Sequence, residues 1–124
     1  MKIRIHEDTV RIRLGRRELG ELLASQFLLS TTRFPTGRLR FGLSLDADLS
    51  GPVVDCAEGL VGIGLPREAF STWARGQEES YAFSTPLEDS SLDVLIEKDF
   101  PCDSRTDCPA GEDLFTPTSL QLWD

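Results

Sequence analysis

The sequence predicts an α+β domain with a mainly antiparallel sheet of about seven or eight strands, arranged as a sandwich or open barrel, and two short helices. Its 124 residues suit one domain with a single core, here residues 1–124. Most segments alternate apolar and polar residues, which is the period of a strand. Most successive strands are separated only by turns, whereas a parallel sheet needs longer crossovers.

The first expected element is a hairpin. Residues 2–6 and 9–14 alternate strictly, and Glu7-Asp8 supplies a short turn between them. One face of both strands is apolar. The opposite face carries Lys2, Arg4, Arg11 and Arg13.

A short amphipathic helix is expected next, over residues 15–25. Leu19, Leu22 and Leu23 recur there at helical spacing, although Gly20 weakens the helix.

A second hairpin follows, with strands at 27–34 and 38–46. The turn signal Pro35-Thr36-Gly37 separates them. Alternation in the second strand places Arg38 and Arg40 opposite its apolar residues.

The segments 53–59 and 60–65 predict a third hairpin that turns at Glu58-Gly59. Glycines 59, 62 and 64 lack the helix-opening pattern of a phosphate-binding loop. We interpret them as strand positions where another element packs closely.

The second helix should begin after Pro66 and end at Gly76, because proline suits a first helical turn and glycine stops a helix. Phe70 and Trp73 form its expected buried face. Strands at 80–85 and 91–99 complete the regular part of the chain.

Periodicity stops at Phe100, so residues 100–124 are expected to form an irregular acidic segment that packs on the domain. Leu120, Leu122 and Trp123 would allow a last short strand. No internal repeat of fixed period is evident.

Charge is distributed unevenly along the chain. The net charge is −8, but residues 1–45 hold nine Lys/Arg against four Asp/Glu, and residues 46–124 hold four against seventeen. If the first two hairpins belong to one sheet, up to six cations share one face. They are Lys2, Arg4, Arg11, Arg13, Arg38 and Arg40.

This arginine-rich face predicts a non-enzymatic binding module for an anionic partner, either a protein or a small ligand, because guanidinium groups match phosphate and carboxylate. The alternative is a solvated face balanced by acidic residues of the C-terminal half. Nucleic acid is disfavoured by the acidic composition and by the lack of aromatic residues interleaved with the cations.

A second hypothesis is a metal- or redox-responsive protein built around Cys102, with Cys108, Asp99 and Asp103 nearby. Thiolates favour zinc or copper(I), but the spacing of the two cysteines is looser than in structural zinc sites. A reversible disulfide or two free thiols are the other states. No cofactor is otherwise expected.

The sequence does not predict an enzyme. His6 is the only histidine, it is expected at the surface, and no nucleophile–base pair can be assembled around it.

The chain is expected to be soluble and cytoplasmic. Its first residues are too charged for a signal peptide, no segment is apolar enough to span a membrane, and three cysteines fit a reducing compartment.

Several motifs resemble those of a family of small bacterial proteins of unassigned function. They are KIRI at 2–5, VRIRL at 10–14, TRFP at 32–35, LP at 65–66 before a helix with Trp73, and LIEKDFPC at 95–102. The resemblance extends to Glu112, Asp113, Phe115 and Pro117, with Thr116 in place of an asparagine. Cys102 matches the family cysteine and Cys108 does not.

The resemblance implies no activity. It does imply that Glu97, Lys98, Asp99, Phe100 and Cys102 act as a unit, through packing of the strand end or through a partner.

Overall fold

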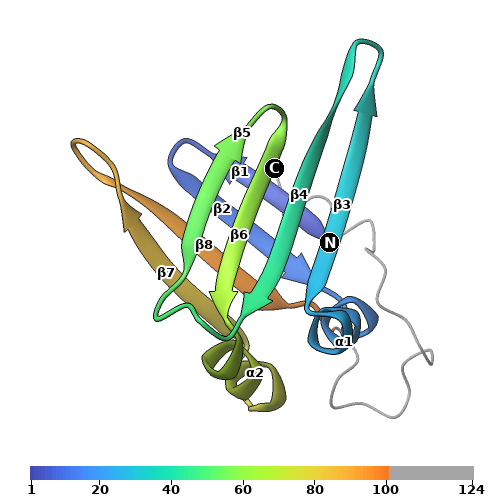
Figure 1. Ribbon diagram of the computed structural model, residues 1–124, viewed down its shortest axis with the longest axis vertical. Helices are drawn as coiled ribbons and strands as arrows, with labels where there is room; N and C mark the ends of the chain where they lie inside the picture. Colours follow the sequence, from blue (N-terminus) through green and yellow to red (C-terminus); the bar gives the residue numbers. More distant parts are fainter. Residues whose placement is uncertain (101–124) are drawn as a thin grey trace.

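The computed structural model describes residues 1–100, and within them it confirms an α+β fold with eight strands and two short helices (Figure 1). Residues 101–124, including the expected last strand, lie outside the described residues. In chain order the elements are β1 (Lys2–His6), β2 (Thr9–Leu14), α1 (Arg16–Ser25), β3 (Phe27–Phe34), β4 (Gly37–Asp46), β5 (Val53–Ala57), β6 (Leu60–Pro66), α2 (Arg67–Arg75), β7 (Ser80–Pro86) and β8 (Ser91–Lys98).

The strands form two four-stranded sheets. Sheet A has the order β1-β2-β8-β7, and sheet B has the order β3-β4-β6-β5. All four hairpins are antiparallel as expected, but the central pairs β2–β8 and β4–β6 are parallel. The prediction of a mainly antiparallel α+β fold is therefore confirmed, and the parallel pairs occur only where two hairpins meet. Turn-length connections fix only the pairing of neighbours in sequence, and the parallel partners come from distant hairpins.

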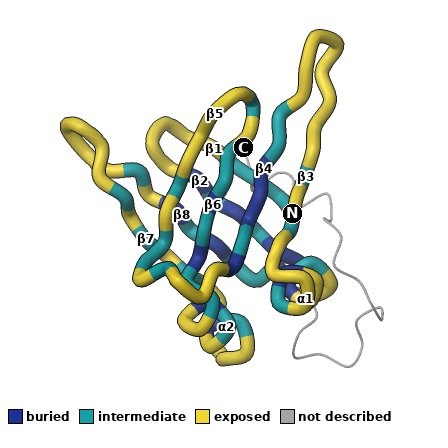
Figure 2. The backbone as a smooth tube through the Cα atoms, viewed as in Figure 1, coloured by how far each residue is buried: buried dark blue, intermediate teal, exposed yellow. Residues whose placement is uncertain are grey.

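One core lies between the two sheets. Its buried residues come from the central strands of both sheets and from both helices: Val10, Ile12, Leu14, Leu19, Leu22, Leu43, Leu45, Ile63, Leu65, Phe70, Trp73, Val94 and Ile96. Figure 2 shows this burial along β2, β4, β6 and β8, whereas the hairpin tips are exposed. Both helices lie at the same end of the sheets (Figure 1).

The helices begin and end for local reasons. At the start of α1, the side chain of Glu18 accepts a hydrogen bond of 3.0 Å from the backbone N–H of Gly15. Gln26 ends this helix in the left-handed conformation, with φ of 64°. In α2, Phe70 and Trp73 are buried, and the rings of Phe70 and Tyr81 lie 5.3 Å apart in an edge-to-face arrangement.

The described chain consists of two ββαββ halves with the same element order, β1 to β4 and β5 to β8, although the sequence shows no repeat of fixed period. If each strand of sheet A is replaced by its counterpart in the other half, the order β1-β2-β8-β7 becomes β5-β6-β4-β3. This is the order of sheet B read from its other edge. The offset is 51 residues from β1 to β5 and from α1 to α2, but 53 from β3 to β7. This change of offset, together with sequence divergence, hides the repeat in the sequence.

Backbone hydrogen bonds recur at the repeated positions. The N–H of Arg40 donates to the carbonyl of Gly59 at 2.8 Å, and its counterpart Asp93 donates to Asp8 at 2.9 Å. Leu45 donates to Gln26 at 3.0 Å, just as Lys98 donates to Glu79 at 3.0 Å. The two halves therefore share strand register as well as strand order.

Within residues 1–100, neither helix has the length and apolar character needed to cross a membrane.

Candidate functional site

Four of the expected cations lie together on the outer face of sheet A. Lys2 and Arg4 extend from β1, and Arg11 and Arg13 extend from β2. The register places Lys2 opposite Arg13 and Arg4 opposite Arg11. We call these four residues the cationic face. Like charges are thus directly opposed twice in succession, an arrangement that is destabilising unless counter-charges are close.

The other two expected cations are elsewhere. Arg38 and Arg40 belong to β4 in sheet B, so the six residues do not share one face. The expectation failed because α1 carries the chain from sheet A to sheet B between the first two hairpins. Alternation within each hairpin was correct, but it does not show which sheet a hairpin joins.

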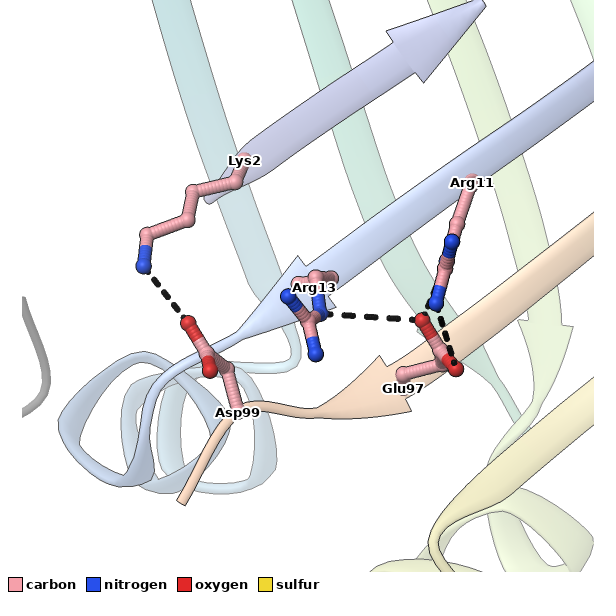
Figure 3. A network of polar contacts seen from close by, with 5 residues as sticks. All are labelled: Lys2, Arg11, Arg13, Glu97 and Asp99. Atoms are coloured by element: carbon pink, nitrogen blue, oxygen red, sulfur yellow. Dashed lines mark hydrogen bonds and ion pairs between the residues drawn. The ribbon is translucent and has the colours of Figure 1, made fainter. Parts of the chain in front are cut away.

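Two carboxylates from the acidic half of the chain are bound to the cationic face (Figure 3). Lys2 Nζ lies 2.6 Å from Asp99 Oδ2. Arg11 donates to both oxygens of Glu97, through Nε at 2.6 Å and Nη2 at 3.3 Å. Arg13 Nε lies 3.6 Å from the same carboxylate. The sequence-based alternative, in which the acidic half supplies counter-charge, is therefore correct for these residues.

Both carboxylates lie at the end of β8 or directly after it, in the segment for which the family resemblance implies a shared role. The N–H of Asp99 donates to the carbonyl of Leu14 at 2.8 Å, and Asp99 is 8% exposed. Lys98 Nζ donates to the carbonyls of Trp73 and Gly76, each at 2.9 Å. The end of β8 therefore packs against β2 and against the end of α2. Cys102 lies outside the described residues.

A shallow hollow of about 280 Å³ lies beside the cationic face, lined by Arg4, His6, Thr9, Arg11 and Leu95. His6 is at the surface as expected, with 74% of its side chain exposed. A third carboxylate, Asp93, faces outward from β8 and accepts a hydrogen bond from Ser84 Oγ at 2.6 Å.

Most of the proposed metal ligands cannot be placed. Cys102, Cys108 and Asp103 lie outside the described residues, and Asp99 is engaged by Lys2. Within residues 1–100, no group of three or more His, Cys, Asp or Glu side chains is arranged to hold a metal ion. Cys56 is an exposed free thiol on β5.

Sequence reasoning missed one feature of sheet B. Gly42, Gly62 and Gly64 lie on its outer face, and they form part of a hollow that Arg40 also lines. The sequence did contain a signal for this hollow, because it places three glycines on neighbouring central strands, and glycine in a strand marks a bulge or a close approach.

The comparisons with known proteins concern the family rather than an activity. No curated protein and no solved structure matches the chain. A family model described as a family of unknown function (DUF7009) matches residues 1–116, which is most of the chain. The chain therefore belongs to this family of unknown function.

Proposed function

We propose that the protein is a binding module that holds a multivalent anionic group of a partner, phosphate or carboxylate, on its cationic face. The observation that carries this proposal is the register of β1 and β2, which opposes Lys2 with Arg13 and Arg4 with Arg11 beside a hollow. An anion placed between two guanidinium groups accepts charge-assisted hydrogen bonds from both and removes their repulsion.

The anchor of this site is the pair Arg4 and Arg11. Both line the hollow of about 280 Å³, together with the exposed side chain of His6 and the hydroxyl-bearing Thr9. Arg side chains present a planar fork of donors that matches the oxygens of phosphate and carboxylate. The site is shallow, so it suits a charged group of a larger partner rather than an enclosed small molecule.

Glu97 competes for the same site. It holds Arg11 with two hydrogen bonds and also lies near Arg13, so an incoming anion must displace it or share the guanidinium groups. Binding is therefore expected to be modest and to weaken with salt. Screening acts over about 30 Å at 0.01 M salt and about 8 Å at 0.15 M.

The test is calorimetric titration of the full chain with tripolyphosphate at these two ionic strengths. Wild type should bind at low salt and bind more weakly at high salt. The double substitution Arg4→Ala and Arg11→Ala should weaken binding about tenfold or more, because hydrogen bonds to charged groups contribute about 1.5–3 kcal/mol.

The matched control is Arg67→Ala with Arg75→Ala, which removes the same charge from α2. It should leave the affinity within about twofold of wild type, a shift of well under 1 kcal/mol. Equal losses in the two double variants would show that binding follows net charge and would refute a site on sheet A.

A further inference from the structure

The outer face of sheet B carries a second surface of different chemistry. By the repeat, Gly62 and Gly64 of β6 correspond to Arg11 and Arg13 of β2. Gly42 of β4 likewise corresponds to Leu95 of β8. Sheet A thus has long side chains on its central strands at these positions, whereas sheet B has glycine at the matching positions.

Two of these glycines are covered by neighbouring side chains and one is open. A Cβ on Gly42 would stand 3.5 Å from the Phe27 ring, with Leu29 at 3.7 Å, and one on Gly64 would stand 2.9 Å from Val53. A Cβ on Gly62 would meet nothing within 4 Å. Gly62 is therefore the floor of a hollow between two apolar walls, which we call the glycine hollow.

The glycine hollow measures about 370 Å³. Its apolar walls remain exposed to solvent: Phe27 is 52% exposed, Val53 50% and Leu29 44%. The volume is at the lower end of the range for ligand pockets, about 300–1,000 Å³, and the hollow is open on one side. This size and shape suit one large apolar side chain of a partner, the usual anchor of a protein interface.

Cationic groups adjoin the hollow on one side. Arg40 lines it, and its buried Nε has no hydrogen-bond partner among the residues that the structure describes. Arg33 and Arg38 are paired directly with each other further along the same hairpin. Alternation along β3 and β4 places them on the same face as Arg40. The lining also includes two carboxylates: Asp55, which is paired with Gly62 across β5 and β6, and Asp46, at the end of β4 far from Arg38. The cationic end of this surface is therefore the end of Arg40, Arg38 and Arg33.

We propose that this face docks an extended acidic segment of a partner protein. The segment inserts one aromatic or long aliphatic side chain against Gly62 and directs its carboxylates toward Arg40 and Arg38. A carboxylate at Arg40 accepts charge-assisted hydrogen bonds from the guanidinium group at the edge of the hollow. This site lies on the other sheet from the cationic face, and it differs from that face in requiring an apolar anchor.

The probe is a short fluorescein-labelled peptide in which Asp alternates with Ser around a central Trp, so that Trp is its one large apolar side chain. It is titrated into the full chain by fluorescence anisotropy. Wild type should bind it saturably. Gly62→Leu fills the hollow and should weaken binding about tenfold or more, and Arg40→Ala should do the same. A peptide with Ala in place of Trp should bind wild type about tenfold more weakly.

Two controls separate this site from the cationic face. In the Arg4→Ala and Arg11→Ala background, Gly62→Leu should still weaken peptide binding about tenfold or more, and Gly62→Leu alone should leave tripolyphosphate affinity unchanged. Folding of Gly62→Leu is checked by its thermal midpoint, and Arg40→Ala provides a test that leaves Gly62 and the apolar walls of the hollow unchanged.

Three results would overturn the proposal. Peptide binding that is unchanged in both Gly62→Leu and Arg40→Ala would place the peptide elsewhere. Equal affinity for the Trp and Ala peptides would show that no anchor is inserted. The third result is self-association of wild type, measured by sedimentation, that Gly62→Leu abolishes. It would show that a second copy of the chain occupies the outer face of sheet B.

Discussion

At the scale of single residues, Glu97 has two opposing effects on the cationic face. Its carboxylate accepts hydrogen bonds from Arg11 and lies near Arg13, so it offsets the repulsion between opposed cations. The same contacts occupy donors that an incoming anion needs. Stability and anion affinity should therefore move in opposite directions when this residue changes.

Glu97→Gln is predicted to lower the free energy of unfolding by about 1–2 kcal/mol, less than the full contribution of hydrogen bonds to a charged group because the amide oxygen of Gln still accepts one. It should raise tripolyphosphate affinity about threefold or more, because one competing charge is removed. Urea denaturation and calorimetry measure the two effects. Glu21→Gln on the exposed face of α1 is the control, and equal effects of both substitutions would contradict the role of Glu97.

Tyr81 provides a second prediction at this scale. It is the only tyrosine, it packs against Phe70, and burial raises its pKa above the ordinary value of 10.0. Because the folded state disfavours the phenolate, the stabilisation is complete below about pH 10 and is lost as pH rises through the folded pKa. The free energy of unfolding should fall more steeply there in wild type than in Tyr81→Phe.

Denaturation of both proteins across that pH range, with phenolate absorbance as the titration signal, tests this expectation. Parallel pH profiles for wild type and Tyr81→Phe would show that Tyr81 is not the responsible group.

At the scale of elements, local sequence determines the hairpins and helices well. Strict alternation in residues 2–14 and the turn at Glu58-Gly59 predicted strands that the structure contains. Phe70 and Trp73 form the buried face of α2 as expected. These features depend on side-chain period and turn chemistry, which the sequence displays directly.

The roles of individual strand glycines could not be predicted in the same way. All three glycines at 59, 62 and 64 were interpreted as positions of close packing. The structure shows a close approach at Gly64 and at the turn residue Gly59, but open space at Gly62. The difference depends on where Leu49 and Val53 place their side chains, which no local pattern specifies.

Two glycine substitutions should therefore have opposite signs. Gly59 has a φ of +78°, and an added Cβ would stand 2.8 Å from the carbonyl oxygen of Arg38. Gly59→Ala should lower the free energy of unfolding by about 1–2 kcal/mol or more, the cost of a left-handed conformation. Gly62→Ala should raise it by about 0.5–1 kcal/mol, because glycine is unfavourable within a strand.

Chemical denaturation of the two variants beside wild type provides the measurement. Destabilisation by Gly62→Ala comparable to that by Gly59→Ala would mean that the hollow is closed by packing, and it would remove the basis for a docking site there.

At the scale of the whole molecule, each half of the repeat contributes one hairpin to each sheet. β1–β2 and β3–β4 belong to different sheets, and each hairpin is completed by a parallel partner from the other half. This arrangement was not predictable from neighbouring residues, because the partners of β2 and β4 lie in the second half. It also explains why the six cations expected on one face are divided between two.

Neither half should therefore fold alone. Fragments 1–50 and 51–124 are predicted to show no cooperative unfolding separately, because each would leave the inner faces of two unpaired hairpins exposed to water. Mixed together, they should regain the circular dichroism and cooperative melting of the intact chain. A monomeric fragment that melts cooperatively by itself would contradict a core shared between the halves.

The proposal of an anion site on sheet A is tested most directly by following backbone amide signals in a nuclear magnetic resonance titration of the full chain with tripolyphosphate. The account predicts that the largest shifts gather on β1 and β2 around Arg4, His6 and Arg11, with Glu97 of β8 perturbed as its contacts change. Shifts that gather on sheet B, or that are spread evenly over all exposed cations, would contradict it.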